Sequence, residues 1–415
     1  MSTALFTQIF VILLAGTLLT RLWLARRHVR HVLGHRHQVP GPFRGKILLK
    51  AHRKAADYTV AKTRFAMVAG VIDALLLLGW TLGGGLEFLD QSWRAAGFGE
   101  LVTGTLFLLS AFLIIGLLDL PATVYQTFVI EQRFGFNHST PALFIADLLK
   151  QALLLFVIGV PLALAALWLM QSAGTLWWFY LWVMWSCFTL LMIWAYPAVI
   201  APLFNKFTPL KNRSVQTRIQ ALLRRTGFRS RGIFVMDGSR RSAHGNAYFT
   251  GFGRNKRVVF FDTLLKTLRG PEIEAVLAHE LGHFHHRHIL KRIVMLFGMS
   301  LAGLALLGWL IQQPWFYQGL GVSTASAHAA LILFLMAGPV FTFLLQPLMS
   351  WGSRRHEYQA DAYAADQAEI KPMISALVKL YRENASTLTP DPVYSAFYDS
   401  HPPASLRIAH LQSLA

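Results

Sequence analysis

The chain has 415 residues, of which 54% are hydrophobic and only 14% are charged. A soluble domain carries about a quarter charged residues, so the composition excludes an ordinary soluble protein and indicates an integral membrane protein with a polar part. The formal net charge of +19 lies mostly between apolar spans, which is typical of membrane topology and argues against nucleic-acid binding. The single cysteine, Cys187, excludes an intrachain disulfide and a thiolate zinc cluster.

Seven apolar stretches reach the roughly 20 residues that a bilayer span requires. We place them near residues 4–24, 65–86, 101–123, 151–171, 176–200, 293–312 and 329–351. The segment 25–64 contains eleven Lys or Arg against one acid, and 201–292 contains eighteen against five. With seven spans, both basic segments fall on one side of the membrane. This predicts an N-terminus outside and a C-terminus in the cytoplasm.

The spans divide the chain into four parts. Spans one to five and the basic loop 25–64 occupy 1–200, the first part of a cytoplasmic domain occupies 201–292, spans six and seven occupy 293–351, and the second part of that domain occupies 352–415. Before residue 270 the pattern predicts a helix over 217–228 and β-rich stretches over 232–236, 246–253 and 257–261. A strand beside a catalytic helix can bind an extended peptide at the sheet edge.

One carboxylate lies unusually deep in the membrane. Asp73 sits in the second span beside Val71, Ile72 and a run of leucines. A charge at this depth should face the interior of the bundle or a wet cavity.

The stretch PEIEAVLAHELGHFHHRHILKR, residues 271–292, predicts a helix with Pro271 in its first turn, followed by a transmembrane span. Inside it lie His279, Glu280 and His283, an H-E-x-x-H motif. Histidines four residues apart share one helical face and can hold one metal ion. Glu280 lies beside that face, where it can deprotonate the attacking water. The motif also occurs by chance in unrelated chains, so it is not sufficient alone.

Three more histidines follow the motif. His286 is seven residues from His279, which is about 10.5 Å along a helix, too far for one ion with bonds of about 2.0–2.1 Å. The longer H-E-x-x-H-x-x-G-x-x-H pattern also fails, because His286 and Ile289 occupy its last two fixed positions. We interpret His285, His286 and His288 as juxtamembrane polar residues, with at most a supporting role behind the ligands.

A catalytic zinc site needs a third protein ligand, and the best candidate lies after span seven, in the stretch SRRHEYQAD. Glu357 and Asp361 are four residues apart there, on one helical face. A ligand carboxylate with a second carboxylate one turn on suits metal binding, and Asp361 would accept the free N–H of a ligand histidine, with His279 the best candidate. The alternative is an ordinary solvated charged helix, which this stretch alone would favour. Its position on the same side as H-E-x-x-H favours the metal site.

Several long motifs occur together and in order. They are FVIEQRFGFN (128–137), YPAVIAPLFNKFTPL (196–210), HGNAYFTGFGRNKRVVFFDTLL (244–265), HELGH, SRRHEYQAD (353–361) and SHPP followed by Arg407. In these motifs the chain resembles the CAAX prenyl protease type 1 family, integral membrane zinc metalloproteases that process prenylated proteins. The resemblance runs from the first basic segment to the tail.

The resemblance implies an α-helical polytopic membrane fold. Seven transmembrane helices would enclose a large intramembrane chamber, with a mostly helical metalloprotease domain and a small β-sheet. One Zn²⁺ per chain would face the chamber. The implied ligands are His279, His283 and Glu357.

The resemblance also implies roles around the metal. Glu280 would act as general base and proton shuttle, and His401 would stabilise the oxyanion. Asn246 would hold the substrate backbone, and Arg407 would help to position that region. Without the family, His401 would be interpreted as a turn residue before Pro402 and Pro403.

We therefore expect a multi-pass membrane zinc endopeptidase that cuts a peptide or protein substrate, with or without a lipid, and does not bind nucleic acid. The oligomeric state stays open. The short loops, and a tail ending in LQSLA without a basic retrieval signal, favour a bacterial member in the inner membrane. One alternative is a quality-control protease of the HtpX heat-shock type, which has fewer spans. The other is a non-catalytic zinc scaffold or transporter, which would not need Glu280 as a base.

Overall fold

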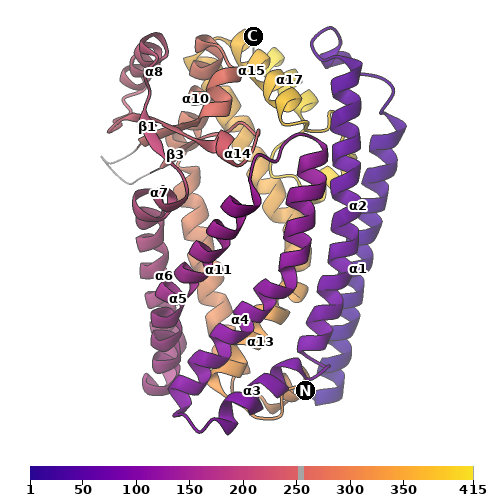
Figure 1. Cartoon of the computed structure of the whole chain (residues 1–415), viewed down its shortest axis with the longest axis vertical. Helices are drawn as coiled ribbons and strands as arrows, with labels where there is room; N and C mark the ends of the chain where they lie inside the picture. The colour runs from indigo at the N-terminus through magenta and orange to yellow at the C-terminus, as the bar shows by residue number, and fades with distance from the viewer. Residues whose placement is uncertain (251–256, 415) are drawn as a thin grey trace.

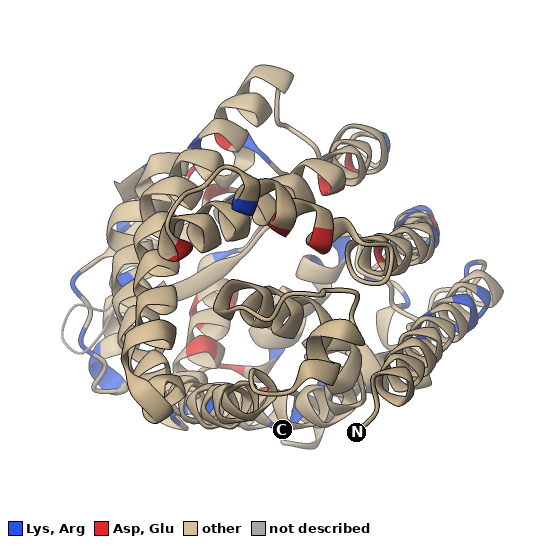
Figure 2. Cartoon of the chain, turned by 90° about the horizontal axis from the view of Figure 1, so that it is seen from below, with Lys and Arg blue, Asp and Glu red and all other residues tan. Residues whose placement is uncertain are grey.

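The computed structural model describes residues 1–250 and 257–414, and seven helices within these ranges are long and apolar enough to cross a bilayer. The seven expected spans are thus confirmed in number. They fall on α1 (Thr3–Gly34), α2 (Leu49–Trp80), α4 (Glu100–Tyr125), α5 (Pro141–Ser172), α6 (Trp177–Ala195), α11 (His288–Leu310) and α13 (Ala327–Thr342), the last running on into α14 (Gln346–Gln367). Seen from one end, the helices form a ring (Figure 2).

The basic segment 25–64 is mostly helical, and its prediction as a loop was wrong. It comprises the end of α1, a short connection with a 3₁₀ turn at Gly41–Phe43, and the first half of α2. A helix of 32 residues is about 48 Å long, whereas the hydrocarbon core is about 30 Å thick, so both helices project beyond the bilayer. Arg36 and Asp57 join the projecting ends through an ion pair of 2.7 Å.

The two ends of the molecule differ in what caps them. The N-terminus lies at one end with the short helices α3 (Gly85–Ala95) and α12 (Pro314–Gln318), and the C-terminus lies at the other with the metalloprotease part (Figure 1). At the first end Asp90 is 1% exposed and contacts His328 at 2.6 Å and Arg94 at 2.7 Å. This buried cluster ties α3 to α13.

The three predicted β-rich stretches form three strands of a four-stranded sheet, and the fourth, β1, was not predicted. Its spatial order is β1-β2-β4-β3, with β2 and β4 parallel and the outer pairs antiparallel. The strands are β1 (Phe207–Pro209), β2 (Ile233–Met236), β3 (Ala247–Thr250) and β4 (Arg257–Phe261). Residues 251–253 of the expected stretch 246–253 lie outside the described residues. β3 lies at the edge of the sheet, where a peptide could be added.

Helices cover this sheet and hold the predicted motifs. The apolar face of α8 (Arg213–Arg225), which replaces the helix expected over 217–228, packs with β2, β4 and α10 (Gly270–His285) around Ile219, Phe260 and Leu277. Short helices lie before and after the sheet, α7 (Ala201–Phe204) and α9 (Asp262–Thr267). The tail adds α15 (Ile370–Glu383), α16 (Pro392–Tyr398) and α17 (Ala404–Ser413).

The stretch 271–292 is two helices rather than one. Helix α10 ends at His285, and α11 begins at His288. Between them Arg287 has a φ of 55°, the left-handed conformation that an L residue other than glycine adopts rarely. This break turns the chain out of the motif helix and into the membrane span.

Helices α10 and α14 lie in close contact. A Cβ atom placed on Gly282 would lie 2.8 Å from the Cα of Ala360, so only glycine fits there without movement. The close approach brings the H-E-x-x-H face of α10 against the face of α14 that carries Glu357 and Asp361.

Candidate active site

Three side chains from two helices converge at the contact between α10 and α14. His279 Nε2 lies 3.5 Å from Glu357 Oε2, and His283 Nε2 lies 3.4 Å from Glu357 Oε1. One ligand atom from each of the three residues lies within 4.8 Å of the others. The structure thus brings together the three residues that the sequence nominated as metal ligands.

The donor set fits a tetrahedral metal ion. Bonds of about 2.0–2.1 Å at tetrahedral angles separate two ligand atoms by roughly 3.3 Å, close to both distances above. Glu357 is 4% exposed, and its Oε2 is buried without a hydrogen-bond partner. A buried carboxylate oxygen left without a donor is costly, and a cation in contact with it would remove that cost.

His279 is held by a buried ion pair on its far side. Its Nδ1 lies 2.8 Å from Asp361 Oδ1, the contact expected from the spacing of Glu357 and Asp361. Asp361 is fully buried, and Arg407 Nε donates to its Oδ2 at 2.8 Å. Arg407 Nη1 also lies 3.5 Å from Glu357 Oε2. Arg407, expected to position the substrate region, therefore lies buried behind the candidate ligands.

His283 is held by a residue that the sequence did not nominate. Its Nδ1 lies 2.9 Å from the Nδ1 of His288, whose Nε2 in turn lies 2.8 Å from Gln359 Oε1. His288 is 2% exposed and stacks on His356 with ring centroids 4.0 Å apart. From the sequence, His288 was expected to have at most a supporting role behind the ligands, and its contacts with His283 and Gln359 agree with that role. The break at Arg287 turns His288 back toward the motif, and the helical spacing of the sequence could not indicate this.

Glu280 is half-buried beside His279 and His283, and His401 lies beside Glu357. Burial raises the pKa of the Glu280 carboxyl, against the opposing effect of His279 and His283 beside it. His401 comes from the loop between α16 and α17, its Nε2 lies 3.4 Å from Glu357 Oε1, and its side chain is 61% exposed. Ser400 Oγ lies 3.0 Å from His401 Nδ1. An exposed imidazole beside the ligands can meet a bound substrate.

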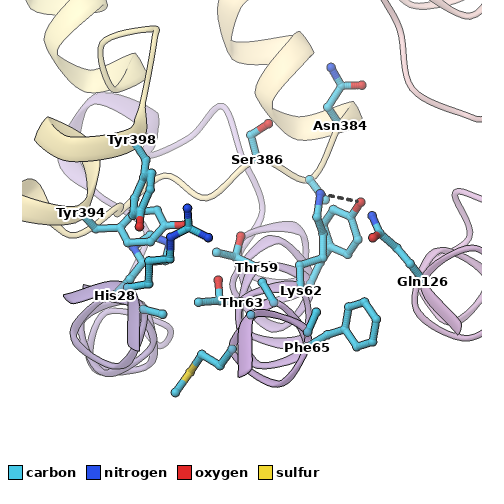
Figure 3. Close-up of a pocket in the computed structure, with 18 of the residues that line it drawn as sticks. His28, Thr59, Lys62, Thr63, Phe65, Gln126, Asn384, Ser386, Tyr394 and Tyr398 are labelled. Atoms are coloured by element: carbon cyan, nitrogen blue, oxygen red, sulfur yellow. Dashed lines mark hydrogen bonds between the residues drawn. The ribbon is translucent and has the colours of Figure 1, made fainter. Parts of the chain in front are cut away.

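Asn246 does not contact the metal cluster through any hydrogen bond or ion pair found among residues 1–250 and 257–414. It is exposed, its Oδ1 accepts from the Ala247 backbone N–H at 2.8 Å, and it lies immediately before the edge strand β3. It also lines a cavity of about 1130 Å³ that extends between α1, α2 and the tail (Figure 3). Asp73 lines the same cavity, in agreement with the expectation that it faces a wet space.

Models of two protein families together match nearly the whole chain. Residues 28–206 match the N-terminal part of CAAX prenyl proteases, described as five membrane helices. Residues 209–415 match peptidase family M48. The N-terminal match favours a CAAX-type protease over the quality-control alternative with fewer spans.

Curated relatives and a solved structure agree with these matches. A CAAX prenyl protease 1 homolog of Arabidopsis thaliana is 39% identical over 70% of this chain and 69% of its own length. A Caenorhabditis elegans homolog is 30% identical over 98% of both chains. The crystal structure of S. mikatae Ste24p superposes with a TM-score of 0.90, at 30% identity, over 98% of this chain and 99% of that one. The chain therefore belongs to the M48 family of CAAX prenyl proteases, integral membrane metalloproteases.

Proposed function

We propose that this protein is a zinc endopeptidase that removes the C-terminal peptide of lipidated CAAX substrates. The observation that carries the proposal is the convergence of His279, His283 and Glu357 with the exposed His401 next to an edge strand. Helices α10 and α14 supply these ligands, although two membrane spans separate them in sequence. Such a site combines metal chemistry with a surface for an extended peptide.

In this proposal His279 and His283, through the Nε2 atoms that face Glu357, and the Glu357 carboxylate would hold the metal. Three protein ligands leave one position open, as catalytic zinc sites require. Zinc in such a site supplies Lewis acidity, which activates water as a nucleophile and polarises a carbonyl group. The Arg407 guanidinium adds a positive charge 3.5 Å from Glu357 Oε2.

Glu280 would be the base that takes the proton of the attacking water. Burial raises its pKa, which makes the carboxylate a stronger proton acceptor than an exposed glutamate. The protonated carboxyl can then deliver the proton to the departing amine. This transfer needs no other titratable group.

His401 would donate a hydrogen bond to the developing oxyanion. If the Ser400 hydroxyl donates to Nδ1 across their 3.0 Å contact, the imidazole proton lies on Nε2, the atom that faces the metal cluster. A donor fixed before the reaction stabilises the transition state without reorganisation. Asn246, at the start of β3, would bind the substrate backbone.

The contact that each ligand histidine makes through Nδ1 assigns its tautomer. Metal binding through Nε2 leaves the proton on Nδ1, so His279 donates to Asp361 and His283 donates to His288. His288 must then accept through Nδ1 and carry its own proton on Nε2, where Gln359 accepts it. Asp361, His288 and Gln359 are therefore positioning residues.

Two substitutions test the mechanism as a pair. Glu280→Gln should lower kcat at least about 10²-fold while zinc content stays at one per chain, because the base is lost and the ligands remain. Glu357→Gln should lower zinc content itself, measured by metal analysis of purified protein. Normal turnover in Glu280→Gln, or full occupancy in Glu357→Gln, would contradict the assigned roles.

The substrate class is tested with two peptides. Purified protein should cleave a farnesylated CAAX peptide faster than the same peptide without the lipid. Equal rates would favour a quality-control protease with broad specificity.

The basic, metalloprotease end would face the cytoplasm by the positive-inside rule. The short connections still favour the inner membrane of a bacterium. Protease protection of the tail in oriented vesicles, and fractionation of the native host, test the two placements.

A further inference from the structure

The residues that line the cavity beside Asn246 carry a net positive formal charge. Its lining includes three residues that are charged at neutral pH, Arg21, Lys62 and Asp73. Arg21 and Asp73 balance in formal charge, so Lys62 leaves one positive charge in excess. Thr59, Lys62 and Thr63 of α2 face Asn384 and Ser386 of the tail across the cavity (Figure 3).

Lys62 has no carboxylate partner within 4.0 Å among the described residues. Its Nζ lies 3.4 Å from the Tyr58 hydroxyl and 4.8 Å from the centre of that ring. The Tyr58 hydroxyl donates to Glu131 at 2.6 Å, so its oxygen remains free to accept from the ammonium group. Lys62 is exposed in the part of α2 that projects from the bilayer, and the Glu131 carboxylate is reached only through the Tyr58 hydroxyl, so the ammonium group can contact an anionic ligand in the cavity.

The edge strand sets which end of a substrate enters the cavity. β3 runs away from Asn246, and antiparallel strand pairs are the more common kind. A peptide added antiparallel to β3 would therefore run toward Asn246, and its C-terminal end would pass into the cavity.

Lys62 is linked by side-chain contacts to the residues that precede the edge strand. Lys62 connects back to the strand through two contacts, since Tyr58 OH lies 3.4 Å from Lys62 Nζ and 3.4 Å from the Nε2 of His244. His244 precedes Asn246 by two residues.

We propose that Lys62 binds the free α-carboxylate of the substrate, so that the enzyme recognises the C-terminal end of its substrate. This inference rests on the proposed function, because only a C-terminal substrate carries that carboxylate within reach. The ligand class is a peptide carboxylate, recognised by a single exposed ammonium group in the cavity lining.

The test uses full-length, zinc-loaded protein and two farnesylated CAAX peptides, one with a free carboxylate and one with a C-terminal amide. The wild type should prefer the carboxylate about tenfold or more in kcat/KM. Lys62→Met should remove this preference by raising KM for the carboxylate peptide, with the amide peptide unaffected. Lys62→Arg should keep most of the preference, which a merely structural role of the side chain would not explain.

Arg64→Met is the matched control, because Arg64 is an exposed cation on the same helix outside the cavity lining. It should leave the preference unchanged. Lys62→Gln replaces Lys62→Met if the latter does not fold, as judged by zinc content and thermal unfolding. An unchanged preference in the folded neutral variant, or none in the wild type, overturns the inference while leaving the proposed function intact. Failure to cleave either peptide contradicts the proposed function itself.

Discussion

His279 and His283 lie one turn apart on α10, yet their Nδ1 atoms meet different partners. His279 faces the Asp361 carboxylate at 2.8 Å, which is in turn paired with Arg407, whereas His283 faces the imidazole of His288 at 2.9 Å. The first support is a buried ion pair, and the second is a relay of neutral groups.

The two supports fail in different ways. Removing one member of a buried ion pair leaves the other charge unpaired, which costs about 3–5 kcal/mol. Removing a neutral hydrogen-bond acceptor costs about 1–3 kcal/mol when its donor stays buried. Loss of the Asp361–Arg407 pair should therefore weaken both the metal site and the stability of the fold. Loss of His288 should affect the orientation of His283 more than the stability of the fold.

Breaking the charged support should have the largest effect. Asp361→Asn should weaken zinc binding about 10–100-fold and lower the thermal unfolding temperature, because Arg407 is left buried without its partner. Competition with a chelator and thermal unfolding of the metal-free protein measure the two effects separately. Asp57→Asn is the control, since Asp57 also pairs with an arginine but is 40% exposed, and it should change neither quantity. Unchanged zinc affinity in Asp361→Asn would contradict the role of Asp361 in positioning His279.

Breaking the neutral support should have a smaller effect. His288→Ala should weaken zinc binding about tenfold, with the unfolding temperature of the metal-free protein less affected than in Asp361→Asn. His288→Asn should recover part of the affinity, because its side-chain oxygen can accept from His283. His285→Ala, an exposed neighbour, should have no effect. Equal zinc affinities in His288→Ala and His285→Ala would show that His288 does not position His283.

A third contact holds the helix that carries both histidines, and it predicts the smallest effect. Burial alone would raise the pKa of Glu272, but hydrogen bonds from the Arg269 backbone, Lys379 and Ser375 outweigh burial and lower it. A lowered pKa in the folded state contributes stability above the unfolded-state pKa, and this contribution is lost as the pH falls through the folded-state value.

Glu272→Gln should therefore reduce stability at pH 7 and flatten its decline below about pH 4.3, the ordinary pKa of a glutamate. Thermal unfolding at pH 7, 5 and 3.5 measures the slope. Glu383→Gln, in an exposed pair with Arg382, should keep the wild-type profile. A slope equal to wild type in Glu272→Gln would show that this carboxylate does not sense pH.

Sequence patterns predicted the parts of this molecule that depend on local composition. Apolar length located seven spans, and helical spacing brought His279 and His283 to one face. Glu357 required topology as well, because only its side of the membrane favoured it over an ordinary charged helix. Helix propensity explains the error in 25–64, since Lys and Arg favour helices and allow them to project from the bilayer.

The positions of two supporting residues, His288 and Arg407, could not be predicted because they depend on tertiary packing. A left-handed residue other than glycine has no reliable sequence signal, so the turn at Arg287 that places His288 was not foreseen. Arg407 follows His401 by six residues, yet it is 6% exposed while His401 is exposed. The packing of α17 against α14 produces this difference.

The order of the ligands along the chain has a consequence for biosynthesis. Glu357 follows His279 by 78 residues and is made only after α11 and α13. At about 5–20 residues per second, the ribosome needs roughly 4–16 s to cover that interval. Throughout this time the nascent chain presents two histidines and a glutamate base without the third ligand or His401. In the proposed mechanism, the protein cannot cut neighbouring nascent proteins before Glu357 and His401 have been made.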